Sequence, residues 1–440
     1  MGGFFMLTSP GQSSGRLICM TPTTGNAAPA LGSERFELID IIRGFALFGV
    51  MVANMVWITQ WFALTSEDRA AMPTARVDDI VGSLSYLLID YKFYTIFSML
   101  FGLGFAMQLT RSAQRGQPIS ALYARRLAIL FVLGMAHGIL LWFGDILHIY
   151  AMIGFVLLNV SGCSDKTLLR WALGIAVLVG SLPFIQWCTI TLGWTFEHES
   201  TDPNKKTELF LAISDGTWLD IVRLNWNAFF DAYTDRILGM DGTIYWFLSV
   251  LWKFLVGFVI GRRMLLQHAE QHLRLYRRVL PWALGIGLIG GGAVWLADAF
   301  FDVWLADESS PVSLVWIFIE LSTAALSIAY ICILVLLFQR PSERRWISML
   351  APVGQMALTN YLFQSVQLVL LFYGVGLGLM GRVGTTGCLA ICFVSFVLQI
   401  VVSAWWLRYF RFGPAEWAWR CLTYGQRYPL RRRPQPKAAI

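Results

Sequence analysis

The chain has 440 residues, of which 57% are hydrophobic and only 14% are charged. Soluble globular domains carry about 25% charged residues, so this composition excludes an ordinary soluble protein and predicts a polytopic membrane protein. The formal net charge of +7 does not indicate a nucleic-acid partner, because basic loops on the cytoplasmic side of a membrane explain it. Seven cysteines without CxxC spacing and five scattered histidines give no metal-ligand pattern, so no metal is expected.

The chain begins with a segment unlike the rest, residues 1–33, which is rich in Gly, Ser, Thr and Pro. It lacks the charged start and the long apolar core of a cleavable signal peptide, so we expect a disordered lead. A membrane span needs about 20 mainly apolar residues. Ten segments within a helical bundle at 34–410 qualify, at about 39–60, 82–109, 126–143, 146–161, 168–193, 242–260, 280–300, 312–338, 347–375 and 385–407.

The loops between these segments alternate in charge. Arginines concentrate at 111–126, 261–278 and 339–345 and in the tail, whereas the intervening loops are acidic or neutral. Ten spans with both termini in the cytoplasm satisfy this pattern. The long loop at 194–241 is then outside, and its periodicity predicts one or two helices on the outer membrane surface. After the Gly–Pro break, residues 411–440 predict a cytoplasmic interfacial helix and a basic tail.

The first span carries three polar residues on one face. Asp40, Arg43 and Asn54 follow helical spacing, and Asp40 can pair with Arg43 at i,i+3. Asn54 lies three turns beyond Arg43, at about 16 Å. This stripe predicts one wall of a polar passage. The alternatives are that Arg43 reaches lipid phosphate and that Asn54 bonds a neighbouring helix.

Other deep polar residues fall in the outer halves of later spans. Lys92 lies in the second span, and His137 and Asp145 lie in a predicted hairpin formed by the third and fourth. A buried histidine beside a carboxylate is suited to general-base chemistry, although a structural histidine is the plain alternative. Asn360 and Gln364 lie in the ninth span. We expect these side chains to line a shared polar cavity, with scattered interhelical bonds as the alternative.

A carboxylate nine residues into the eighth span, Glu320, needs a cationic partner at that depth. Lys92 is the expected partner, and Arg382 is the second choice.

Five motifs in order carry a resemblance to a known family: RFELIDIIRGFALFGVMVANM, YKFYTIFSMLFGLGFAMQL, RRLAILFVLGMAHGILLWFGDILHIYAMIGFVLL, VGQMALTNYLFQSVQ and RFGPAEWAWRCLTYG. They resemble the YeiB family of bacterial inner-membrane proteins from Arg35 to Tyr424. That family looks like a branch of the transmembrane acyltransferases, whose relatives include the lysosomal heparan glucosaminide N-acetyltransferase and bacterial surface-sugar O-acyltransferases. The resemblance implies that cytoplasmic acyl-CoA is the co-substrate and that an acceptor outside the membrane receives the acyl group.

The catalytic histidine of those relatives does not carry over by position. The DxxRG start matches at Asp40, Arg43 and Gly44, but the O-acyltransferase histidine, eleven residues after the arginine, corresponds to Asn54 here. The first outer loop, where the heparan enzyme has its histidine, contains none in this chain. His137 is therefore the substitute candidate on chemical grounds.

The leading hypothesis is a membrane acyltransferase in the bacterial inner membrane. Asp40, Arg43, Arg125 and Arg126 would hold the CoA phosphates at the cytoplasmic mouth. His137, oriented by Asp145, would deprotonate a small-molecule, lipid or glycan acceptor. Lys92, Asn360 or Asn54 would stabilise the oxyanion, with Gln364 and Glu320 lining the cavity.

Two further hypotheses use the same polar residues. A transporter or lipid-handling protein would be gated by Glu320 and Lys92, although the absence of a convincing internal repeat counts against it. A structural or sensory subunit without chemistry is the third. The expected partners are the lipid bilayer and the acceptor, with a second copy of the chain as a further partner.

Overall fold

The computed structural model describes residues 36–59, 64, 66–114, 120–192, 210–233, 242–301 and 316–432. The lead predicted at 1–33 lies outside these residues, as do parts of the predicted outer loop and the end of the basic tail. Within the described ranges the regular elements are helices. In addition, Phe410 and Arg431 form one isolated antiparallel β-bridge.

The described helices follow one another in this order: α1 (Glu37–Ile58), α2 (Ser66–Ala70), α3 (Ala75–Leu88), α4 (Lys92–Gln114), α5 (Ser120–Leu140), α6 (Leu147–Val160), α7 (Asp165–Thr191), α9 (Trp218–Tyr233), α10 (Thr243–Arg262), η3 (Ala269–His272), α11 (Leu273–Phe301), α12 (Trp316–Phe338), α13 (Pro341–Ile347), η5 (Ser348–Leu350), α14 (Ala351–Gln355), α15 (Ala357–Phe372), α16 (Thr385–Tyr409) and α17 (Pro414–Tyr424).

Eight helical stretches among the described residues are long and apolar enough to cross a membrane. They are Glu37–Ile58, Ala75–Ser112, Ala121–Leu140, Asp165–Thr189, Thr243–Arg262, Ala269–Ala297, Ile317–Phe338 and Thr385–Tyr409. Two shorter apolar helices, α6 and α15, fall on the remaining two predicted segments. This arrangement supports a multi-pass helical membrane protein. The count of ten spans and the cytoplasmic position of both termini stay predictions.

Two segments predicted as continuous helices are interrupted. The segment at 82–109 is divided between α3 and α4, and Tyr91 at the junction has a left-handed φ of 63°. The segment at 347–375 is divided at Met356, whose φ of −110° and ψ of 36° are not helical. Hydropathy does not reveal either break, because the residues at both junctions are compatible with a helix by composition.

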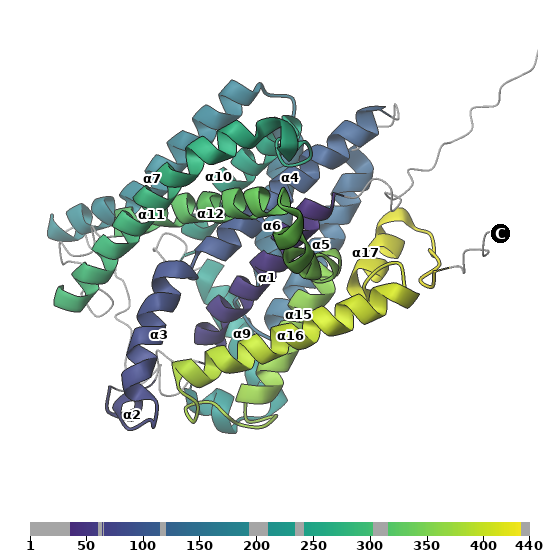
Figure 1. Cartoon of the computed structure of the whole chain (residues 1–440). Helices are drawn as coiled ribbons and strands as arrows, with labels where there is room; N and C mark the ends of the chain where they lie inside the picture. Colours follow the sequence, from purple (N-terminus) through teal and green to yellow (C-terminus); the bar gives the residue numbers. More distant parts are fainter. Residues whose placement is uncertain are drawn as a thin grey trace, which may run out of the picture.

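Helix α1 lies at the centre of the bundle and packs against α4, α14, α15 and α16 (Figure 1). Its close approach to α14 depends on two glycines. A Cβ at Gly44 would clash with the backbone oxygen of Leu350, and a Cβ at Gly354 would clash with that of Asp40. Small residues at such crossings allow the backbones of membrane helices to touch. The glycine of the DxxRG start therefore has a packing role.

Candidate functional site

Two histidines share one carboxylate at the turn between α5 and α6. The Nδ1 atom of His137 lies 2.8 Å from Oδ1 of Asp145, and the Nδ1 atom of His148 lies 2.9 Å from Oδ2. All three residues are buried, at 3–4% exposure. The sequence left open whether His137 and Asp145 face each other, and the structure brings them into contact. It also adds His148, which lies three residues after Asp145 in the chain.

The predicted antiparallel hairpin produces this cluster. Helix α5 ends at Leu140, and the tight turn that follows brings Asp145 back beside His137. Asp145 also accepts the backbone N–H of His148 at 3.0 Å, a first-turn donor of α6 that has no partner within the helix. Gly134 makes room, because a Cβ there would lie 2.7 Å from Oδ2 of Asp145.

The ionisation state of Asp145 determines which nitrogen atoms of the two histidines donate hydrogen bonds. Burial alone would raise the pKa of this carboxyl, but hydrogen bonds from His137 and His148 and their charges lower the pKa to about 2. An ionised carboxylate can only accept, so both Nδ1 atoms donate to it, and Nε2 is the ring nitrogen left to accept a proton when an imidazole held in this way is neutral. The Nε2 atom of His137 is therefore available as a proton acceptor.

Two polar atoms in this region have no hydrogen-bond partner among the described residues, although both are buried. They are Nε2 of His137 and the hydroxyl of Tyr361. The two rings are adjacent, with centroids 5.1 Å apart. The Tyr361 hydroxyl also lies beside the Asp145 carboxylate and the backbone of Ile146. Buried polar atoms normally have a hydrogen-bond partner, so these two atoms indicate a place for a ligand or a water molecule.

Helix α9, from the predicted outer loop, covers the cluster. Phe229 packs on His148 with ring centroids 4.7 Å apart, and Tyr233 lies 6.1 Å from the same ring. Asn225 fixes α9 to the end of α5 by donating to the backbone oxygen of Ile139 at 3.2 Å. The helix predicted to lie on the outer membrane surface thus forms one wall of the site.

The four residues predicted to bind CoA gather where α1, α5 and α17 meet. Arg43 pairs with Asp40 at 2.7 Å and donates to the backbone oxygen of Gly354 at 3.3 Å. Arg126 is within electrostatic range of Arg43.

The predicted interfacial helix α17 holds the two α5 arginines from the other side. The Arg126 guanidinium lies 4.0 Å from the ring centroid of Trp419, whose indole N–H donates to the Arg126 backbone oxygen at 3.0 Å. The guanidinium of Arg125 lies beside Gly425, the left-handed residue that ends α17.

The amide side chains of α15 bond to α16. Asn360 donates to Ser403 at 3.0 Å, and Gln364 donates to Gln399 at 3.0 Å. These are interhelical hydrogen bonds of the kind expected as the alternative to a shared cavity. Asn54 is half-buried, and no described hydrogen bond links its side chain to the histidine cluster.

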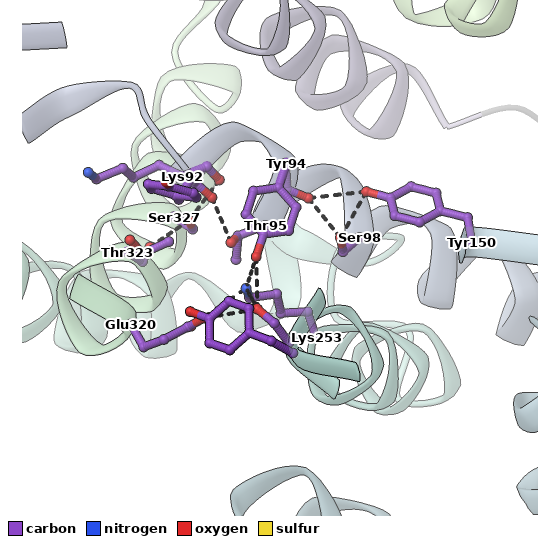
Figure 2. Close-up of polar contacts among 12 residues, drawn as sticks. Lys92, Tyr94, Thr95, Ser98, Tyr150, Lys253, Glu320, Thr323 and Ser327 are labelled. Atoms are coloured by element: carbon purple, nitrogen blue, oxygen red, sulfur yellow. Dashed lines mark hydrogen bonds and ion pairs between the residues drawn. The ribbon is translucent and has the colours of Figure 1, made fainter. Parts of the chain in front are cut away.

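The expected pairing of Glu320 with Lys92 is wrong. Glu320 pairs instead with Lys253 of α10, at 3.6 Å. Lys92 follows the break between α3 and α4, and its ammonium turns back to donate to the backbone oxygen of Tyr86 at 2.6 Å. Figure 2 shows Lys92 extending away from Glu320. Lys253 was not predicted as a partner, although a single lysine in the middle of the apolar run FLSVLWKFLVGF was a visible signal.

The helices and these buried polar clusters define a multi-pass membrane protein with polar sites inside the bundle. Residues 260–426 match the family described as a protein of unknown function, DUF418. The uncharacterized protein YxaH of Bacillus subtilis (strain 168) is 29% identical over 420 residues, covering 91% of this chain and 97% of that protein. The uncharacterized protein YeiB of Escherichia coli (strain K12) is 28% identical over 412 residues, covering 89% and 96%. These matches support a YeiB-like family.

Proposed function

We propose that this protein is a membrane acyltransferase that moves an acyl group from cytoplasmic acyl-CoA to a hydroxyl or amine acceptor outside the membrane. The observation that carries the proposal is His137. Its Nδ1 atom is held by Asp145, and its Nε2 atom is buried without a partner. An imidazole fixed in this tautomer, beside an ionised carboxylate, is arranged as a general base.

In this proposed reaction, His137, Asp145 and Tyr361 each have a separate role. Nε2 of His137 takes the proton of the acceptor as its oxygen or nitrogen attacks the thioester carbonyl, and Asp145 stabilises the resulting imidazolium. The C–S bond then breaks, and the CoA thiolate receives the proton from His137. The Tyr361 hydroxyl, whose ring lies against His137, is closer to the reacting imidazole than Lys92 or Asn360, whose donors are engaged elsewhere, so we assign it the donation to the oxyanion.

The arginines at the junction of α1, α5 and α17 support a binding place for the CoA phosphates. Guanidinium groups bind phosphate through paired, charge-assisted hydrogen bonds. Arg43 is only partly buried, with 27% of its side chain exposed, so it remains accessible to a ligand. The bacterial inner membrane, a lipid, glycan or small-molecule acceptor, and assembly with a second copy remain parts of this proposal.

Binding of acetyl-CoA to the purified protein in detergent is the first test. Saturable binding is expected, and Arg43→Ala should abolish it because it removes a phosphate contact. Arg340→Ala, at the exposed start of α13, is the matched control and should bind normally. Absence of binding to the folded wild-type protein would contradict the proposal.

Acyl transfer from labelled acetyl-CoA to membrane lipids and glycans tests the role of His137. Loss of a general base costs about 10²- to 10⁴-fold in rate, so His137→Ala should reduce transfer by that factor. His268→Ala, whose side chain is 44% exposed, should leave transfer unchanged. Transfer that persists at the wild-type rate in His137→Ala would exclude His137 as the base.

A transporter or lipid-handling protein is the second candidate. It is favoured by the charged pair inside the bundle, now formed by Glu320 with Lys253. Proton-coupled solute flux in proteoliposomes that is lost in Glu320→Gln would support this candidate over acyl transfer.

A further inference from the structure

A second polar cluster lies where α4, α10 and α12 meet. Lys253, midway along α10, is 0% exposed. Its ammonium donates to the hydroxyl of Tyr94 at 2.5 Å and to Oγ of Ser249 at 2.7 Å, and it lies 3.6 Å from the carboxylate of Glu320. Figure 2 shows Tyr94, Lys253 and Glu320 converging from the three helices. None of these residues belongs to the histidine cluster.

The hydrogen bonds in this cluster have a direction. An ammonium can only donate, and a carboxylate can only accept. Tyr94 accepts from Lys253 and lies 2.8 Å from Oγ of Ser249. Ser249 in turn donates to Oε1 of Glu320 at 2.9 Å. Two hydroxyl groups therefore connect the amine to the carboxylate in an unbroken donor sequence.

When Lys253 and Glu320 are both charged, their contacts do not fully offset the cost of burying the two charges. Charges within a membrane span are costly unless they are closely paired and hydrogen-bonded. The 3.6 Å separation is long for an ion pair, and Oε2 of Glu320 is buried without a hydrogen-bond partner among the described residues. The neutral form, an amine beside a carboxylic acid, avoids this cost and competes with the ion pair.

We propose that Lys253, Tyr94, Ser249 and Glu320 form an intramembrane proton-exchange site. A proton passes from Nζ of Lys253 to the Tyr94 hydroxyl, the Tyr94 proton passes to Ser249, and the Ser249 proton passes to Oε1 of Glu320. The amine and the carboxyl are then neutral, and no other atom is gained or lost. Glu320 exchanges this proton with the surroundings, because 14% of its side chain is exposed whereas that of Lys253 is fully covered.

Titratable groups from two helices face Glu320. From α10 these are Lys253 and Tyr245, whose hydroxyl lies 3.4 Å from Oε1. From α4 they are Tyr94 and Tyr91. Lys253 is the only cation within 4 Å of the Glu320 carboxylate in the described part of the chain. Its charge therefore controls whether Glu320 holds the proton.

Labelling with a membrane-soluble carbodiimide tests this site, because the reagent takes the proton of a carboxylic acid and adds to its oxygen. Peptide mass mapping of the wild-type protein should show an adduct at Glu320 that decreases as the pH rises. Glu320→Gln should abolish the adduct. Lys253→Met should remove the pH dependence, since a carboxyl without its cation stays protonated at this depth. If Glu320 is labelled in Lys253→Met but not in the wild-type protein, Glu320 and Lys253 form a permanent structural ion pair. That result would overturn the proposal.

Infrared difference spectra between low and high pH test the relay, and they serve if Lys253→Met fails to fold. The C=O band of a protonated carboxyl should appear in wild type and vanish in Glu320→Gln. Ser249→Ala should shift this band, because it removes the hydroxyl that is hydrogen-bonded to Oε1. Ser327→Ala is the matched control, since Ser327 is a buried serine of α12 that bonds to the backbone oxygens of Lys92 and Thr323, and it should leave the band in place. An unshifted band in Ser249→Ala would exclude Ser249 from the relay.

Discussion

At the residue scale, Asp145 determines what the histidines can do. It accepts hydrogen bonds from two imidazoles and one backbone N–H. Each of these bonds favours the ionised carboxylate, and together they outweigh the cost of burying it. A neutral replacement would leave the histidines free to adopt the other tautomer. Asp145 is therefore a positioning residue for His137.

The stability of the protein should depend on the ionisation of Asp145. The pKa of Asp145 is depressed in the folded state to about 2, against about 3.9 for an unfolded aspartate. Its contribution is therefore complete above about pH 5 and is lost as the pH falls toward about 2. In thermal unfolding in detergent, the unfolding temperature of wild type should be higher than that of Asp145→Asn at neutral pH. This difference in unfolding temperature should become smaller as the pH is lowered.

Asp231→Asn is the control for this measurement, because Asp231 is exposed on α9. It should change the unfolding temperature little at any pH. A difference between wild type and Asp145→Asn that stays constant across the acid range would contradict an ionised Asp145.

At the scale of elements, α17 stabilises the start of α15. Glu416 accepts the backbone N–H groups of Leu358 at 2.6 Å and Thr359 at 3.1 Å, and the Thr359 hydroxyl at 2.5 Å. The first N–H groups of a helix have no partner within it, so a carboxylate from another element acts as its cap. This contact ties the C-terminal helix to the helix that carries Tyr361.

Removing this cap should destabilise the protein. Glu416→Ala should cost about 1–2 kcal/mol in unfolding free energy, because buried N–H donors lose their acceptor. Glu416→Gln should cost less, since its amide oxygen still accepts. Burial raises the pKa of Glu416 in spite of hydrogen bonds from Thr359, so the loss of charge is well tolerated. Chemical unfolding in detergent would compare the variants, and equal losses for Ala and Gln would contradict the capping role.

At the scale of the whole molecule, the direction of each span decides which clusters face which side. Helix α7 runs 27 residues from the turn after α6 toward the predicted outer segment that contains α9. At 1.5 Å per residue it is about 40 Å long, enough to cross a bilayer core of about 30 Å once. Positions before and after α7 should therefore lie on opposite sides.

Single cysteines in a cysteine-free background would measure this topology. Gly162→Cys, before α7, and Ser342→Cys, at the start of α13, should react with an impermeant maleimide from the cytoplasmic side, whereas Asp215→Cys should react from the opposite side. All three positions are exposed. Reaction of all three from the same face of sealed vesicles would contradict the predicted crossing.

Some relations between residues were predictable because they are local. His137 and Asp145 are eight residues apart on either side of a short turn, so a hairpin brings them together. The contact of Asp40 with Arg43 follows directly from helical spacing. Glu320 and Lys253 are 67 positions apart, and their meeting depends on how α10 packs against α12, which no local pattern specifies.

The sequence by itself determined that this is a helical membrane protein and where its apolar segments lie, because the bilayer requires about 20 consecutive apolar residues whatever their neighbours are. It also placed polar residues at depth, where they need partners. Only the tertiary structure decided which partners meet. In the structure Lys92 donates to Tyr86, Lys253 pairs with Glu320, and α9 packs on His148. These contacts depend on helix breaks and on packing between segments that are distant in the chain.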